Sequence, residues 1–448
     1  MKKSILMFLA MIMIAVTAVS CGSANSGETL RIYCWNDEFQ GRFRAYYPEW
    51  ESTDTDGNDM LKDGTKVEWV IVANQDNAYQ NALDNALLDQ ESAEREDRID
   101  IFLVEADYAL KYVNTDYTLD VIEDIGLTEA DMANQYSYTQ DIVTDSSGAI
   151  KGSTWQATPG LFAYRRSIAL DVLGTDDPTA VQTYISNWDK FDDVAEDMKD
   201  AGYFMISGYD DAYRTFSNNI SNPWVNASDE IVIDPVMLDW VAQTKLYTDQ
   251  DYNNKSSLWN STWFADQGPD GTTFGFFYST WGINFTLAGS SLADAEAPAE
   301  VGNGIFGDWA VTTGPASYYW GGTWICAADG TDNVDLVKDI MLKLTCDDDI
   351  MKQLTLDTQD FTNNSVAMQE IANDATYGSA FLGGQNHVAL FVESAAQIDM
   401  SNISPYDQGL NENFQGAFAD YFAGTITYEQ ALANFYIAVL EIYPELSE

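Results

Sequence analysis

Hydrophobic positions along the chain follow the period of strands in some stretches and of helices in others. Apolar runs at residues 30–35, 67–73 and 99–104 predict three strands. Between the second and third runs, apolar residues recur at helical spacing from Tyr79 to Leu87, with Asn74 or Asp76 available as the N-cap. This opening predicts a βαβαβ unit, in which parallel strands are covered by helices.

A second α/β block follows the first, and the last third of the chain is helical. Polar links that contain glycine or proline, at residues 156–160, 314–322 and 360–364, separate the blocks. We therefore predict an α/β fold with two similar lobes joined by a hinge of three segments. The predicted helices of these later blocks are 188–199, 235–247, 334–345, 348–356 and 428–442, and the predicted strands are 203–207, 274–278 and 309–313.

The first residues have the layout of a secretory signal. Lys2 and Lys3 precede an apolar stretch at 5–16, and small residues lead to Cys21. We predict a signal peptide over residues 1–20, acylation of Cys21 and a flexible tether over 21–28, which places the mature protein on the extracytoplasmic face of the cell membrane as a lipoprotein. A transmembrane anchor is the alternative, but the apolar run is short for a span of about 20 residues.

Charge excludes several classes of partner. The chain has 21 Lys and Arg against 71 Asp and Glu, a formal net charge of −50, which becomes −52 when Lys2 and Lys3 leave with the signal. Such a field repels nucleic acid and anionic lipid. The length of 448 residues exceeds what one hydrophobic core fills, which again favours two lobes.

Metal and cofactor chemistry has little support in the sequence. Apart from Cys21 the cysteines are Cys34, Cys326 and Cys346, without metal-ligand spacing, and His387 is the one histidine, which a loop hydrogen bond would explain. Cys34 fits a buried reduced thiol, and a disulfide between Cys326 and Cys346 stays open. We expect no metal ion.

Two other motifs are weak. Residues 52–63 carry acidic side chains at some calcium-loop positions, but an acidic surface loop explains them better. Residues 302–307 match G-x-G-x-x-G without a strand before and a helix after, and no P-loop or G-x-S-x-G occurs. We therefore expect no cofactor and no hydrolase nucleophile elbow.

Polar and aromatic side chains gather where predicted strands end. These positions hold the mixture that sugars need, because aromatic faces cover the C–H side of a ring while carboxylates, amides and guanidinium groups pair with hydroxyls. Helix caps and core tryptophans are the alternative explanation for any single position. The residues are Trp35, Asn36, Asp37 and Glu38 after the first strand, Glu105 and Asp107 after the third, and Asp211 and Arg214 after residues 203–207.

Several tryptophans stand in polar or glycine-rich settings rather than in periodic apolar runs. Examples are Trp224, Trp281 and Trp320, the last followed by Gly321 and Gly322. A flanking glycine lets a ligand approach the backbone and leaves an indole face uncovered. These positions are therefore further candidates for contacts with a sugar.

Most of the chain after residue 28 resembles the extracellular solute-binding proteins of family 1, which serve carbohydrate ABC importers. The resemblance rests on IYCWNDEF at 32–39, DIFLVEADYALKYV at 100–113, WQATPG at 155–160 with YRR at 164–166, YWGGTWI at 319–325, FTNN at 361–364 and GGQN at 383–386. It implies a periplasmic-binding-protein-like (Venus-flytrap) fold, with an N-lobe of residues 29–157 plus 322–362 and a C-lobe of 160–318 plus 365–448.

The resemblance also implies a function. A protein of this family captures a carbohydrate, here expected to be an oligosaccharide, and delivers it to permease subunits powered by a separate ATPase, with no catalysis of its own. We expect a monomer, because closure of the lobes needs free surfaces. A secreted glycoside hydrolase and a surface sugar-sensing module are the alternatives. Glu105 stands where relatives often have Asp. The predicted ligand-binding residues are Trp35, Asn36, Asp37, Glu38, Glu105, Asp107, Gln156, Asp211, Arg214, Trp281, Trp320, Gly321 and Gly322.

Overall fold

The computed structural model describes residues 28–448 of the chain. The predicted signal peptide 1–20, Cys21 and all of the tether 21–28 except Glu28 lie outside these residues. From residue 28 onward, no helix combines the length and the apolar character that crossing a membrane requires.

Seven strands form the larger sheet, in the order β2-β3-β4-β1-β5-β12-β6. The centre is parallel, because β1 pairs with both β4 and β5, whereas β12 joins β5 and β6 in antiparallel pairs. All but one residue of β5 is buried, as expected for a strand covered on both faces. The strands are β1 Thr29–Cys34, β2 Trp50–Thr53, β3 Asp59–Leu61, β4 Lys66–Ile71, β5 Ile101–Glu105, β6 Ser153–Thr154 and β12 Thr323–Ala327.

The three predicted strands of the opening are confirmed as β1, β4 and β5, with two corrections around them. The hairpin of β2 and β3 stands between the first and second predicted strands and extends the sheet edge. Neither Asn74 nor Asp76 caps helix α2 (Ala78–Asp89), because Asp76 and Asn77 adopt left-handed backbone angles in a turn before it. Residues 52–63 form this hairpin, and the described residues contain no cluster of metal ligands there or elsewhere.

A smaller sheet has β7 at its centre, between β10 and β11, and both pairs are antiparallel. The sequence predicted two similar lobes, but the sheet of this half is antiparallel whereas the centre of the larger sheet is parallel. A separate pair, β8 with β9, lies nearby, and β8 begins later than predicted because the Tyr203 N–H bonds to Met198 O and closes helix α7. The strands are β7 Gly160–Arg165, β8 Ile206–Gly208, β9 Asn253–Ser256, β10 Gly275–Ser279 and β11 Trp309–Thr312.

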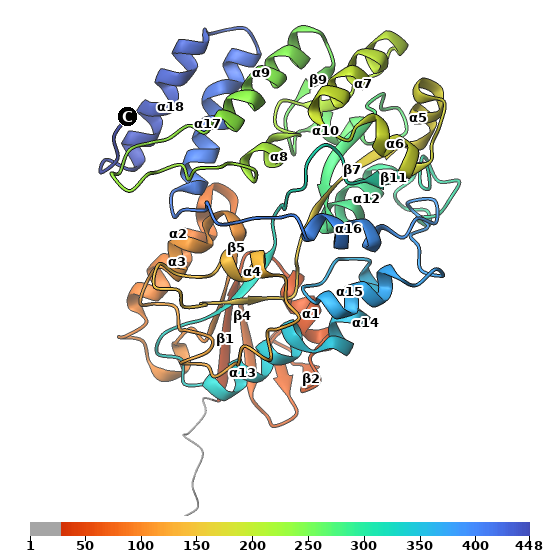
Figure 1. Cartoon of the computed structure of the whole chain (residues 1–448). Helices are drawn as coiled ribbons and strands as arrows, with labels where there is room; N and C mark the ends of the chain where they lie inside the picture. The colour runs from red at the N-terminus through yellow and green to blue at the C-terminus, as the bar shows by residue number, and fades with distance from the viewer. Residues whose placement is uncertain (1–27) are drawn as a thin grey trace, which may run out of the picture.

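Figure 1 shows the two sheets in separate halves of the molecule, which we call the seven-stranded half and the three-stranded half, each covered by helices. The helices near the larger sheet are α1 Glu38–Tyr46, α2, α3 Ala109–Val113, α4 Ser137–Asp141, α13 Val334–Met341 and α14 Asp348–Thr358. The others are α5 Arg166–Leu173, α6 Pro178–Tyr184, α7 Trp188–Ala201, α8 Tyr213–Ser217, α9 Pro235–Asp249, α10 Ser261–Asp266, α11 Thr280–Gly282, α12 Ala288–Ser290, α15 Ser365–Ala372, α16 His387–Ala395, α17 Asp407–Phe422 and α18 Tyr428–Ile442.

The predicted links run side by side between the halves. Gln156 bridges Thr362, and Pro159 bridges Tyr319, so segments from three distant parts of the chain are hydrogen-bonded to one another. The Trp320 N–H also bonds to Thr158 O at 3.1 Å. The exact lobe boundaries given above stay a prediction.

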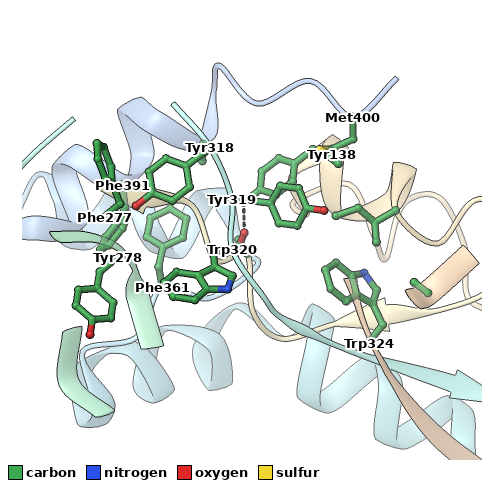
Figure 2. Close-up of a cluster of buried hydrophobic side chains, with 14 of the residues drawn as sticks. Tyr138, Phe277, Tyr278, Tyr318, Tyr319, Trp320, Trp324, Phe361, Phe391 and Met400 are labelled. Carbon is green, nitrogen blue, oxygen red and sulfur yellow. Dashed lines mark hydrogen bonds between the residues drawn. The ribbon is translucent and has the colours of Figure 1, made fainter. Parts of the chain in front are cut away.

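Aromatic side chains hold this junction in both halves, as Figure 2 shows. Successive residues of an extended segment point to opposite sides. Tyr318 packs against Phe277 of β10, with ring centroids 6.0 Å apart, whereas Tyr319 packs against Tyr138 of α4 at 6.5 Å. One short segment is therefore anchored in both halves.

The cysteines, His387 and Trp224 have defined environments in the structure. Cys34 and Cys326 are buried free thiols, and Cys346 is also free, so no disulfide joins Cys326 to Cys346. His387 begins α16 rather than lying in a loop, and its Nε2 is 3.0 Å from Gln359 O. Trp224 was expected to expose an indole face, but it is buried against Phe414 and Phe435, so this expectation was wrong. A turn and then β11 follow Gly302, in keeping with a chance G-x-G-x-x-G match.

Candidate functional site

A cavity of about 480 Å³ opens at the junction, within the size range of small-ligand sites. The end of β1, the start of α1 and the end of β5 form one wall. Helix α11 and the π-helical turn Ile283–Leu287 form the opposite wall, and the linking segments form the floor. The lining residues are Trp35, Asn36, Asp37, Glu38, Arg42, Glu105, Gln156, Trp259, Thr280, Trp281, Asn284, Phe285, Trp320, Gly321, Gly322, Thr323, Thr358 and Asp360.

Three tryptophans form a continuous aromatic wall. Trp259 stacks on Trp281 with ring centroids 6.0 Å apart and an interplanar angle of 11°, and Trp320 meets Trp281 edge-on at 5.2 Å. The Trp281 Nε1 donates to Trp320 O at 2.9 Å, which fixes the orientation of that indole. Trp259 leaves 49% of its surface exposed, so an aromatic face is available to a ligand.

Gly321 makes this packing possible. Its φ is +73°, in the region that favours glycine, and an added Cβ would lie 3.0 Å from Trp281 Nε1. Gly322 is similar, with φ +107° and a would-be Cβ 3.0 Å from the Trp324 ring. Gly321 therefore lets the Trp320 segment approach the indole of Trp281, and Gly322 lets it approach the indole of Trp324.

Trp35 comes from the other half of the molecule, just past the end of β1. Its ring packs edge-on against Tyr79 at 5.6 Å and Tyr108 at 6.3 Å, and the side chain stays partly exposed. The cavity thus has aromatic surface from both halves.

A polar cluster crosses the floor of the cavity. The Gln156 Nε2 donates to Glu38 Oε1 at 2.9 Å and to Asp360 Oδ2 at 3.2 Å, and Thr280 donates to the other oxygen of Asp360. Arg42 Nη2 lies 3.5 Å from Glu38 Oε1. Burial, and then the charge of Asp360, raise the pKa of Glu38 to about 7. This cluster joins α1, two linking segments and α11.

Glu105 lies on the cavity wall at the end of β5. Its Oε2 accepts from the Asp107 N–H at 2.8 Å, and burial, followed by the Asp107 charge, raises the pKa of Glu105 to about 8. Asp107 itself does not line this cavity and forms a two-pronged ion pair with Arg214 of α8. Asp107 and Arg214 instead line a smaller cavity of about 40 Å³ between the halves.

Asp211 lies behind the aromatic wall rather than on it. Its carboxylate accepts from the Gly208 N–H at 2.6 Å and from Trp263 Nε1 at 2.8 Å, and only 5% of the residue is exposed. These bonds match the structural role of a turn cap, which was the alternative explanation for such positions.

Ten of the thirteen predicted ligand-binding residues line the cavity, and Asp107, Asp211 and Arg214 do not. Contact of these ten with a sugar stays a prediction. Trp259 was missed although it stands in a polar Ser-Ser-Leu-Trp-Asn-Ser stretch, the same signal that selected Trp281. Phe285 was missed because an apolar run normally indicates core, yet 79% of it is exposed at the cavity. The other lining residues that the sequence did not indicate are Arg42, Thr280, Asn284, Thr323, Thr358 and Asp360.

No protein-family model matches the sequence, and no curated protein matches it either. Solved structures are similar along nearly the whole chain. An extracellular solute-binding protein of family 1 has a TM-score of 0.69 at 15% identity, covering 92% of this chain and 99% of that one. A binding protein of an ABC transporter from B. animalis subsp. lactis, in complex with β-1,6-galactobiose, has a TM-score of 0.66 at 17% identity, with 95% and 100% covered.

A third similar structure is the galacto-N-biose and lacto-N-biose I binding protein of the ABC transporter from Bifidobacterium longum. Its TM-score is 0.64 at 14% identity, with 94% of this chain and all of that chain covered. At such identities the likeness concerns the fold. The chain has the periplasmic-binding-protein-like fold of the extracellular solute-binding proteins of family 1.

Proposed function

We propose that this protein binds a carbohydrate outside the cell and delivers it to an ABC importer. One observation carries the proposal: the wall of Trp259, Trp281 and Trp320 shares a cavity with carboxylates and amides from the other half of the molecule. Aromatic faces match the apolar side of sugar rings, and carboxylates accept hydrogen bonds from hydroxyls. The similar structures that hold galactobiose and lacto-N-biose support the same ligand class.

Binding would use the junction as a hinge. A sugar that touches both walls stabilises the closed arrangement more than the open one, which shifts the population toward closure. The closed form then docks on permease subunits powered by a separate ATPase. In this proposal the protein acts as a monomer and supplies recognition without catalysis.

The location belongs to the same proposal. The predicted signal peptide and the acylation of Cys21 would place the protein on the extracytoplasmic face of the cell membrane, attached by its lipid. Growth of the cells with radiolabelled palmitate would test the anchor. We expect the labelled protein in the membrane fraction, and we expect a Cys21→Ser variant to carry no label and to leave that fraction.

The central test is calorimetric titration of residues 28–448 with a panel of neutral mono- and oligosaccharides, together with reducing-end assays on the same mixtures. We expect saturable binding in the micromolar range, about −8 kcal/mol, and no new reducing ends. New reducing ends would identify a glycoside hydrolase. Absence of binding to every sugar would contradict the proposal.

A further inference from the structure

The charged groups of the cavity are unequally distributed. Four carboxylates line it, from Asp37, Glu38, Glu105 and Asp360, against the single guanidinium of Arg42. The wall therefore has a formal charge of −3 when all five groups are ionised. Such an excess bears on which ligands the cavity accepts, because like charges placed side by side at an interface repel each other.

Arg42 is already engaged by the protein. Its Nη2 lies 3.5 Å from Glu38 Oε1 and 4.0 Å from Asp360 Oδ2, so two carboxylates flank one guanidinium. Arg214, the other nearby arginine, pairs with Asp107 on the far side of Glu105. Among the described residues, Arg42 is thus the one cation of the cavity lining, and two carboxylates of the protein compete with an anionic ligand for it.

Two of the carboxylates keep oxygen atoms without protein partners. Asp37 is exposed and its side chain forms no hydrogen bond within the described part of the chain, and Glu105 uses only Oε2, toward the Asp107 N–H. Burial, followed by the charge of a neighbouring carboxylate, raises the pKa of Glu38 to about 7 and that of Glu105 to about 8. Ionisation of the carboxyl groups on this wall is therefore already unfavourable, and the wall presents acceptor oxygens that need donors.

We propose that the cavity selects saccharides without negative charge and binds an amino sugar more tightly than the neutral sugar of the same shape. This inference rests on the proposed carbohydrate-binding function and names its ligand class. An ammonium group supplies three donors to the oxygens of Asp37 and Glu105 and a positive charge beside Asp37, whereas a uronate would add a fifth carboxyl group. The net charge of −50 acts in the same direction at longer range.

The test extends the neutral panel with amino sugars and acidic sugars. The probes are glucosamine, galactosamine and the disaccharide of chitosan on one side, and glucuronate, galacturonate and digalacturonate on the other, titrated into residues 28–448 at pH 7. We expect glucosamine or galactosamine to bind at least about threefold tighter than glucose or galactose, and every acidic sugar at least about tenfold weaker than the best neutral one.

A matched pair of variants separates the cavity from the general field. Asp37→Asn removes a carboxylate whose side chain forms no hydrogen bond within the described residues, and it should narrow the gap in affinity between amino and acidic sugars by about threefold to tenfold. Glu300→Gln removes one charge from an exposed position outside the cavity and should leave the gap unchanged.

Each outcome is decisive. The charge selectivity is wrong if neutral sugars bind and an acidic sugar binds with the same affinity. It is also wrong if neutral sugars bind and no amino sugar has a higher affinity than its neutral counterpart. Either result would leave the carbohydrate-binding function standing. An equal effect of Glu300→Gln would also overturn the charge selectivity. If no sugar of any charge binds, the proposed function fails, and the selectivity fails with it.

Discussion

Trp259 is both packed and exposed at the candidate site. It is held against Trp281 by stacking and still has about half its surface exposed, 49%. An aromatic group in such a position is unusual as packing and suited to covering a ligand. The other strongly exposed aromatic residue of the cavity, Phe285, lies in a π-helical turn, a rare geometry that is frequent at functional sites.

Replacing this indole should weaken sugar binding while the fold stays intact. We expect Trp259→Ala to lose about tenfold or more in affinity, because a stacked ring contributes about 0.5–1.5 kcal/mol beyond its buried area. Titration with a sugar that binds the native protein measures the loss. Tyr184→Ala removes a similarly exposed aromatic group, 43% exposed, outside the cavity and should not change affinity. If the native protein and both variants bind the sugar with equal affinity, Trp259 does not contribute to the site.

Gly321 allows a second test of the aromatic wall. Gly384 is its control, because it has a similar positive φ but no close neighbour. Gly321→Ala adds a methyl group 3.0 Å from Trp281 Nε1, whereas Gly384→Ala, at φ +89°, meets open space. Both should lower the free energy of unfolding by about 1–3 kcal/mol, because their φ is unfavourable for alanine. Only Gly321→Ala should also weaken sugar binding. Thermal unfolding and titration distinguish the two effects, and a sugar affinity unchanged in Gly321→Ala would contradict the packing described for Trp281.

Glu105 makes stability depend on pH in a defined direction. Its pKa in the folded protein is raised to about 8, so the folded state holds a proton that the unfolded chain releases near its ordinary pKa of 4.5. The folded state then binds more protons, and the free energy of unfolding falls as pH rises from about 5 to 8. Glu38, raised to about 7, acts in the same direction.

Glu105→Gln should therefore raise the unfolding temperature at pH 8.5 and change it little at pH 5, measured by calorimetry. Glu300→Gln, at an exposed site, is the control for loss of one surface charge. If Glu105→Gln shifts the unfolding temperature equally at both pH values, or lowers it more at pH 8.5, the raised pKa is not the cause.

At the scale of elements, the contact between Glu105, Asp107 and Arg214 joins the two halves beside the sugar cavity. Asp107 belongs to the turn after β5, and Arg214 belongs to α8 of the three-stranded half. Because Glu105 accepts the Asp107 N–H, a group on the cavity wall also positions the carboxylate that reaches across the junction. Such a pair stabilises whichever arrangement brings the halves together.

Removing this ion pair should favour an open arrangement. We expect Arg214→Ala to weaken sugar binding several-fold and to increase the radius of gyration of the sugar-free protein in X-ray scattering. Arg214→Lys should recover part of the effect, because lysine keeps the charge but not the two-pronged geometry. Lys245→Ala removes an ion pair within one half, with Asp249, and is the control. Scattering and affinity that are identical in Arg214→Ala and the native protein would show that the pair does not hold the halves together.

The molecule as a whole carries a charge that works against its own compactness. With 71 acidic and 21 basic residues, self-repulsion destabilises the folded state, and dissolved salt screens it. We expect the unfolding temperature to rise by several degrees between about 0.02 and 0.5 M sodium chloride. Sodium sulfate at equal ionic strength serves as a comparison that adds a salting-out effect. A flat or falling dependence on sodium chloride would contradict net repulsion.

Sequence pattern determined part of the secondary structure and most of one wall of the site, but it did not indicate strands β2, β3, β6, β7, β9 and β12. Trp35, Asn36, Asp37 and Glu38 could be predicted because the chain after a parallel strand emerges at the carboxyl edge of the sheet, where open α/β folds bind ligands. The positions of the three linking segments could also be predicted, because glycine and proline interrupt periodic apolar runs where the chain leaves a sheet.

Only the tertiary structure decided which way the remaining side chains face. Asp107, Asp211 and Arg214 follow strands as well, but Asp107 and Arg214 pair with each other across the junction, and Asp211 accepts from the nearby Gly208 N–H and from the distant Trp263. Trp259 and Trp224 have similar polar neighbours in sequence, yet one is half exposed at the cavity and the other is buried under α17 and α18. Local period specifies an element and its faces, whereas exposure depends on what distant segments place against each face.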